Sequence, residues 1–114
     1  MKTIHTAKAP EAIGPYSQAI VHGGLLFTSG QVEADTIEGQ TEQVMQNLAA
    51  LLEEAGASFD SVIKTTCFLS DMADFAAFNA IYGAYFVSKP ARSCVAAKQL
   101  PKNVLVEVEL IAAV

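Results

Sequence analysis

Arginine occurs once in this chain of 114 residues, at position 92, whereas lysine supplies every other basic side chain. The stretch around it, KPARSCVAA, continues into apolar residues, and alternation along a strand places Arg92 and Cys94 on one face. A guanidinium offers a planar fork of donors that matches a carboxylate two-for-two, which an ammonium group cannot do. The residues alone favour a carboxylate clamp and a structural ion pair about equally.

Two glutamates interrupt the apolar C-terminal stretch LVEVELIAA. Alternation places Glu107 and Glu109 on one strand face, and a glutamate in so apolar a strand either faces water or has a partner. Glu109 is expected to face solvent. If the last two strands pair as an antiparallel hairpin around residues 100–103, Glu107 and Arg92 lie near the same end of it. Glu107 is then either a salt-bridge partner or an acid–base group beside an anion clamp.

Tyr16, in GPYSQA, and Ser29, in FTSGQ, are the remaining polar residues at turns or strand ends that could line a site. Anchoring a loop and capping a turn are their commoner uses. No Gly-x-Ser-x-Gly motif is present, and no histidine lies near a candidate nucleophile. Cys94 is therefore interpreted as a small core residue rather than as a nucleophile. Neither metal-ligand spacing nor a glycine-rich nucleotide loop is present, so no metal or cofactor is predicted.

The hydrophobic pattern predicts the elements that must position these residues. The predicted elements are a hairpin over residues 17–31 turning at Gly23-Gly24, helices over 37–55 and 72–87, and strands over 61–69, 92–99 and 104–112. Gly56 suits the end of the first helix, and Pro90 is expected to stop the second. This order predicts one α+β domain over residues 1–114, a single mixed sheet with two helices packed on one face. The other face is left for a second copy of the chain to cover.

Composition excludes several classes of partner. The net charge is −5 and no basic run exists, so a nucleic-acid surface is not predicted. No apolar run approaches the length of a membrane span, and the N-terminus lacks an apolar signal core. We expect a cytoplasmic protein with no membrane contact, whose two cysteines are reduced.

Four segments together, APEAIGPYSQA, FTSGQ, PARSCV followed by LP, and VEVELIA, resemble the Rid (YjgF) family, and Arg92 places the resemblance nearest its RidA subgroup. The resemblance implies a Rid/chorismate-mutase-like fold and a homotrimer whose sheets form a barrel-like core, with sites in clefts between subunits. It also implies a cofactor-independent enamine/imine deaminase. Such an enzyme converts 2-aminoacrylate, 2-iminopropanoate and 2-iminobutanoate to 2-oxo acids and ammonia.

By the same resemblance, Arg92 holds the substrate carboxylate and Glu107 polarises the attacking water. The other residues implied to line the cleft are Tyr16, Ser29, Asn79 and Cys94. Residues 32–40, VEADTIEGQ, form a segment about a dozen residues shorter than its counterpart in family members. A non-catalytic, 2-oxo-acid-binding or regulatory trimer is the alternative, and it would need Arg92 but not Glu107.

Overall fold

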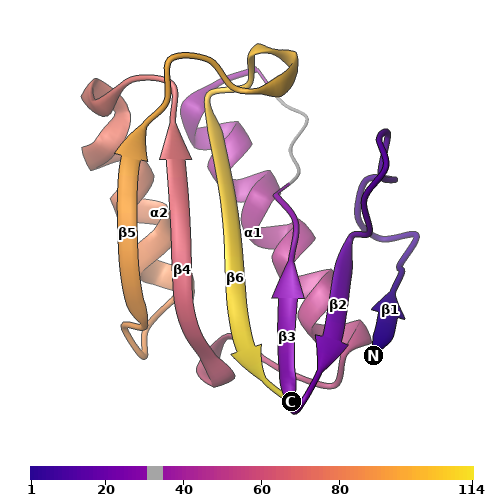
Figure 1. Ribbon diagram of the computed structural model, residues 1–114. Coiled ribbons are helices and arrows are strands. Elements are labelled where there is room, and N and C mark those ends of the chain that lie inside the picture. The colour runs from indigo at the N-terminus through magenta and orange to yellow at the C-terminus, as the bar shows by residue number, and fades with distance from the viewer. Residues whose placement is uncertain (31–34) are drawn as a thin grey trace.

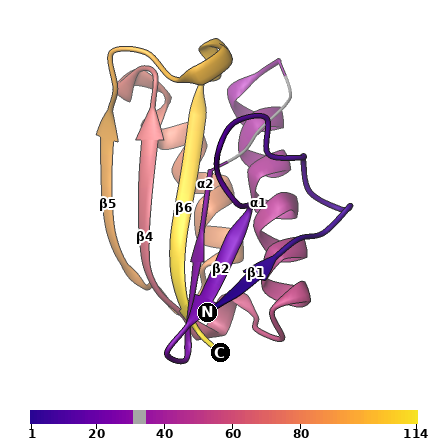
Figure 2. The same cartoon turned by 45° about the vertical axis from the view of Figure 1, so that its right-hand side comes forward.

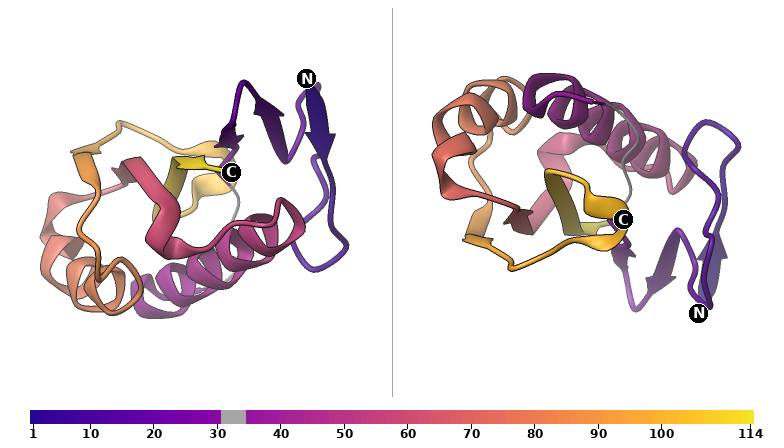
Figure 3. Two further views of the ribbon diagram at one scale, coloured as in Figure 1. Left: turned by 90° about the horizontal axis from the view of Figure 1, so that it is seen from below. Right: turned by 90° about the horizontal axis from the view of Figure 1, so that it is seen from above.

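The structure, a computed structural model, describes residues 1–30 and 35–114, so part of the shortened segment lies outside the described residues. One mixed sheet has its strands in the order β1-β2-β3-β6-β4-β5, with both helices on one side (Figures 1 and 3). The strands are β1 (Lys2–Ile4), β2 (Ala19–His22), β3 (Leu25–Thr28), β4 (Val62–Leu69), β5 (Ala91–Ala96) and β6 (Val106–Ala113). The helices are α1 (Ile37–Glu54) and α2 (Phe75–Tyr85). The predicted α+β fold class is confirmed.

Local sequence signals fix the ends of α1. The Thr36 side chain accepts a hydrogen bond from the backbone N–H of Gly39 at 3.0 Å, which satisfies one of the free donors of the first turn. The helix ends before Gly56, whose φ of +77° is readily adopted only without a Cβ. Both ends match the prediction within one residue.

The second helix is shorter than predicted. The Asp71 side chain accepts from the N–H of Ala73 at 2.8 Å and opens a 3-10 turn, Met72–Asp74, that leads into α2. The helix ends at Tyr85, because Phe86 leaves the helical region with a ψ of 60°. The prediction that Pro90 stops this helix was wrong, since the chain turns several residues earlier.

The last two strands do not form a hairpin. β6 lies between β3 and β4 and is antiparallel to both, whereas β5 pairs with β4 in parallel and occupies the sheet edge. The antiparallel hairpin around residues 100–103 that the sequence left open is therefore not formed. A crossover joins the two strands instead, with a 3-10 turn, Pro101–Asn103, above β6 (Figure 2).

The two faces of the sheet differ in character. Against the helices, Val106, Val108 and Leu110 of β6 are at most 2% exposed. The opposite face carries Glu107, Glu109 and the 41% exposed ring of Phe27, so it is mixed rather than uniformly apolar. Within the described part of the chain, no helix has the length and apolarity to cross a membrane.

Candidate active site

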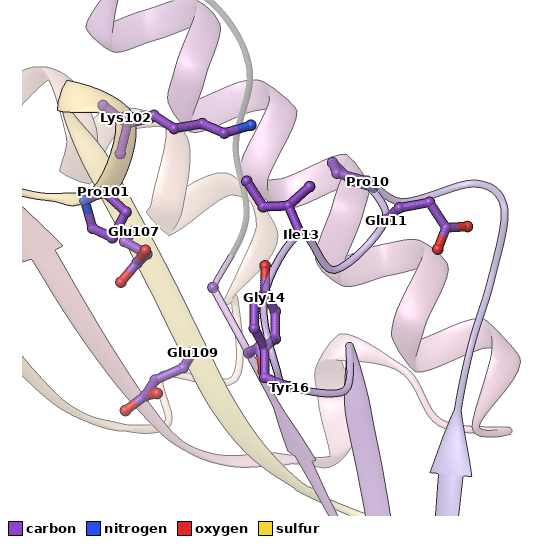
Figure 4. Close-up of a pocket in the computed structure, with 12 residues that line it drawn as sticks. Pro10, Glu11, Ile13, Gly14, Tyr16, Pro101, Lys102, Glu107 and Glu109 are labelled. Carbon is purple, nitrogen blue, oxygen red and sulfur yellow. The ribbon is translucent and has the colours of Figure 1, made fainter.

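One pocket brings together three of the residues singled out in the sequence. A cavity of about 360 Å³ is lined by Tyr16, Ser29 and Glu107. Figure 4 labels Tyr16 and Glu107 in it. Glu109 lines it below Glu107, and Lys102, which belongs to the 3-10 turn Pro101–Asn103, lies at the opposite end. The pocket thus forms where the N-terminal segment and the end of β3 approach the open face of β6.

Glu107 lies in the pocket because its neighbour has no side chain. A Cβ on Gly30 would lie 2.4 Å from the Cγ and 3.0 Å from the Cδ of Glu107, so the glutamate occupies the space that a side chain at position 30 would fill. Burial raises the pKa of Glu107 above its usual range, and the charge of Glu109 raises it further. A carboxylate with a raised pKa is a better proton acceptor near neutral pH.

A buried glutamine, which the sequence analysis missed, organises the N-terminal wall of this pocket. Gln18 is 2% exposed. Its Oε1 accepts from the N–H of Thr6 at 2.8 Å, and its Nε2 lies 2.7 Å from the carbonyl of Pro10, 3.2 Å from that of Thr6 and 3.3 Å from that of Ala9. These contacts fold the segment that leads to Glu11 and Tyr16 against the sheet. A polar residue beside a strand gives no periodic signal, so only the structure reveals this role.

Ser29 lines the pocket, but its hydroxyl proton is engaged. The Ser29 Oγ donates to the carbonyl of Ser17 at 2.7 Å, and the Ser29 N–H donates to the carbonyl of Gln18 at 2.9 Å. Its oxygen can therefore accept a hydrogen bond from a ligand or water, whereas a nucleophilic role would require breaking the bond to Ser17. Tyr16, with 43% of its surface exposed, forms an open wall of the pocket.

Arg92 occupies a different groove, of about 530 Å³, between α2 and the edge strand β5. Its Nη1 donates to Asn79 Oδ1 at 2.7 Å, and its Cζ lies 4.7 Å from the ring centroid of Tyr82. Lys89 lines the same groove, and no carboxylate does. Among the described residues, 1–30 and 35–114, the only ion pairs are Lys8–Glu53 and, when the imidazole is protonated, His5–Glu11. The structural ion pair considered for Arg92 is therefore absent from the described residues.

Cys94 lies beside Arg92 on the helix-facing side of β5 and is paired in register with Cys67 of β4. Both cysteines are free thiols. Burial raises the pKa of Cys94 above its usual range and that of Cys67 to about 12. Both are thus protonated at neutral pH and weak nucleophiles, which agrees with a wall rather than a catalytic role for Cys94.

The structure does not bring Arg92 and Glu107 together within one chain. Arg92 is in register with Thr65 of β4, and Glu107 with Phe68 of the same strand. Paired residues share a face and faces alternate, so Arg92 points toward the helices and Glu107 toward the open side. The hairpin that would have put both residues near the same end is therefore not formed. Tyr16 and Ser29 accompany Glu107, while Asn79 and Cys94 accompany Arg92.

Within the described residues, no group of three or more His, Cys, Asp or Glu side chains could hold a metal ion. The chemistry that the two regions offer is acid–base and electrostatic. One supplies a carboxylate of raised pKa and a hydroxyl oxygen in the same pocket, and the other supplies a guanidinium with donors that no described residue occupies.

Comparison with known proteins gives a consistent result. The family model described as "Endoribonuclease L-PSP" matches residues 6–114. A Salmonella typhimurium protein named 2-iminobutanoate/2-iminopropanoate deaminase is 42% identical, over 97% of this chain and 96% of that protein. A Lactococcus lactis protein named as a candidate regulator, AldR, is 53% identical, over 100% of this chain and 98% of that protein. That alignment spans 124 positions, so the relative contains residues that this chain lacks.

A solved structure also matches along the whole chain. RidA from an Antarctic Psychrobacter species superposes with a TM-score of 0.96 at 37% identity, covering 100% of both chains. The fold and the sequence therefore indicate the same group of proteins, in which some members are named as deaminases and others as regulators.

Proposed function

This chain belongs to the Rid (YjgF) family, and from that premise we propose that it is a deaminase that hydrolyses short-lived 2-imino and 2-enamino acids. The substrate class comprises 2-aminoacrylate, 2-iminopropanoate and 2-iminobutanoate, and the products are 2-oxo acids and ammonia. We further propose that it acts in the cytoplasm without a cofactor.

The observation that carries this proposal is that Arg92 has no anionic partner among the described residues. The guanidinium rests on aromatic rings, has one neutral hydrogen-bond acceptor, and forms no ion pair with a described residue. A half-buried cation of this kind is stabilised by an anion that matches its fork of donors. A 2-imino acid has such an anion, a carboxylate, directly beside its electrophilic carbon.

The proposed reaction needs one further group, a base for water. Glu107 accepts a proton from a water molecule as the water oxygen attacks the C=N carbon of the neutral imine, and the nitrogen takes up a proton from solvent to give a neutral carbinolamine. Glu107 then returns its proton to the nitrogen. The C–N bond breaks as the carbinolamine hydroxyl releases its proton to solvent, so the C=O bond of the 2-oxo acid forms and ammonia leaves. The raised pKa of Glu107 suits both steps, since the same carboxyl acts first as base and then as acid.

The Arg92 groove and the Glu107 pocket can form one site if that site lies between two copies of the chain. We propose a homotrimer in which the Arg92 groove of one subunit faces the Glu107 pocket of its neighbour. Their charges support this arrangement, because the first is lined by two cations and no carboxylate, and the second by three glutamates and one lysine. Opposite charges across an interface favour this pairing over wrong ones. The open face, with its exposed Phe27, supplies apolar surface for the contact.

Trapping of the imine tests the deaminase proposal. A threonine dehydratase and threonine generate 2-aminocrotonate and 2-iminobutanoate, and semicarbazide competes with the protein for the imine. We expect less semicarbazone as protein is added, with 2-oxobutanoate formed in its place. An undiminished yield of semicarbazone at equimolar protein and dehydratase would contradict the proposal.

A mixing experiment tests the shared site. Arg92→Ala and Glu107→Ala are each expected to be inactive alone. After mixed unfolding and refolding, heterotrimers should regain part of the activity, because some interfaces pair an intact groove with an intact pocket. Light scattering gives the mass of each preparation. Failure of the mixture to regain activity, with mixed trimers present, would contradict a site shared between Arg92 of one chain and Glu107 of its neighbour.

A regulatory protein that binds 2-oxo acids is the alternative, favoured by the name of the Lactococcus relative. Such a protein would need Arg92 for the carboxylate and would not depend on Glu107. Glu107→Gln distinguishes the deaminase from the regulatory protein, because it removes the base and keeps the size of the side chain. Binding of 2-oxobutanoate should survive in both cases, whereas loss of imine hydrolysis is expected only for the enzyme.

A further inference from the structure

The guanidinium of Arg92 lies against one face of α2. Its Cζ is 4.7 Å from the ring centroid of Tyr82 and 5.5 Å from that of Phe75, and its Nη1 donates to Asn79 Oδ1 at 2.7 Å. The three partners are spaced four and three residues apart, so they present one side of the helix to the arginine. Two rings and one amide oxygen thus hold a single cationic side chain.

Tyr82 is itself held by the core. It is 8% exposed, and its hydroxyl lies 2.7 Å from Thr65 Oγ1 in β4. Its ring stacks on that of Phe86, with centroids 4.4 Å apart and planes inclined by 25°. The ring beside Arg92 therefore has a fixed orientation, set by a strand and a helix rather than by the arginine.

The donors that remain free match a carboxylate. Among the described residues the only hydrogen-bond partner of Arg92 is Asn79, which leaves Nε and Nη2 without one. Adjacent guanidinium nitrogens are the geometry that grips both oxygens of a carboxylate. Because the amide of Asn79 is neutral, it orients the fork without cancelling the charge.

We propose that Asn79 and Tyr82 are positioning residues that set the fork of Arg92 in advance for the substrate carboxylate. This inference rests on the proposed function, because that function supplies the carboxylate. An arginine already ordered loses less side-chain freedom when the ligand binds. The arrangement therefore affects substrate affinity more than the chemical step.

Nuclear magnetic resonance tests the arrangement without turnover. Arg92 is the only arginine, so its Nε–H gives a single assigned signal in a proton–nitrogen spectrum. We expect that signal to be displaced from the free-arginine position by the ring current of Tyr82. Tyr82→Phe should keep the displacement and Tyr82→Leu should lose most of it. A parent signal at the free-arginine position, or an unchanged displacement in Tyr82→Leu, would overturn the role of Tyr82.

Kinetics tests the role of Asn79. Asn79→Asp places a carboxylate beside Nη1, where it competes with the substrate, so the apparent KM for an imine made by an amino-acid oxidase should rise roughly tenfold or more. The kcat should stay within about threefold, since the base is untouched. Asn103→Asp is the matched control, because Asn103 is exposed and lines neither the pocket nor the groove. A KM within twofold of the parent in Asn79→Asp would overturn the role of Asn79.

The same NMR signal separates failure of this inference from failure of the proposed function. Titration with 2-oxobutanoate should move the Arg92 signal further, and Asn79→Asp should weaken that binding. If binding follows this pattern and the parent protein hydrolyses no imine, the deaminase proposal fails and the positioned clamp stands. If the parent hydrolyses imine and the Asn79 and Tyr82 variants match it in KM and signal, the inference fails and the deaminase stands.

Discussion

Gly30→Ala adds one methyl group at the position where the structure leaves least room for it. The new Cβ would lie 2.4 Å from Glu107 Cγ, whereas ordinary contacts begin at 3.4 Å. Gly30 is not one of the glycines with positive φ, so alanine can adopt its backbone conformation. The substitution therefore acts through the Glu107 side chain and not through the backbone.

The size of the effect follows from that overlap. Glu107 Cγ must move by about 1 Å, and because Cγ lies in the middle of the side chain, the carboxylate moves with it. A displacement of about 1 Å at a reacting group can cost on the order of 10²-fold in rate. We expect kcat/KM for imine hydrolysis to fall by roughly 10- to 100-fold. An off-rotamer glutamate costs only about 0.5–1.5 kcal/mol, so the protein should stay folded.

The semicarbazone competition assay and thermal unfolding measure these two quantities. The decisive comparison is a double-mutant cycle with Glu107→Gln. If Gly30→Ala acts by displacing the base, it should have little effect once the base is absent. An equal loss in both backgrounds, or activity of Gly30→Ala within threefold of the parent, would refute the positioning of Glu107 by Gly30.

Three further substitutions follow from the same geometry. Arg92→Lys keeps the charge but loses the fork of donors, so a charge-assisted contact worth roughly 1.5–3 kcal/mol is lost and kcat/KM should fall by about 10- to 100-fold. The melting temperature should not change. Full activity would show that Arg92 does not bind both oxygens of the substrate carboxylate. Glu109→Gln removes a charge that raises the pKa of Glu107, so the lower-pH limb of the plot of kcat/KM against pH should move to lower pH. The rate at each pH is measured relative to uncatalysed hydrolysis. A limb that stays in place would show that the pKa of Glu107 does not determine its position. Gln18→Leu leaves the buried N–H of Thr6 and several carbonyls without partners. The free energy of unfolding, measured by denaturant titration, should therefore fall by about 2–3 kcal/mol. A loss below about 0.5 kcal/mol would contradict the structural role of Gln18.

Local structure was predictable wherever the sequence holds a strong short-range signal. Val44, Leu48 and Leu51 recur with helical spacing and are all at most 2% exposed on α1. Gly23 and Gly24, both with positive φ, turn the hairpin between β2 and β3 as predicted. The end of α2 was missed because Phe86 leaves the helix while remaining buried, and apolar spacing continues through it.

The strand order was not predictable from neighbours in sequence, because it depends on which strand can be buried on one whole face. On the face that meets the helices, β6 carries the buried Val106, Val108 and Leu110, which suits the centre of the sheet. On the same face β5 carries the half-buried Arg92 and Cys94, which suits an edge. The possible hairpin of the last two strands rested on their proximity in sequence and not on this difference. The difference matters for the site, because a hairpin would have put Arg92 and Glu107 near the same end of it.

The alternation of side chains between the two faces of the sheet separates Arg92 from Glu107, so a site shared between chains is necessary if both act on one substrate. Thr65 and Phe68, their partners on β4, are three residues apart, and an odd separation puts two side chains on opposite faces. Slipping β5 by one residue would move Arg92 to the open face, but it would also take the guanidinium off the ring of Tyr82. The contacts that fix Arg92 therefore keep it away from Glu107 of its own chain. Its position on the edge strand leaves it within reach of a neighbour, so the same register that separates the two residues within one chain allows them to meet between chains.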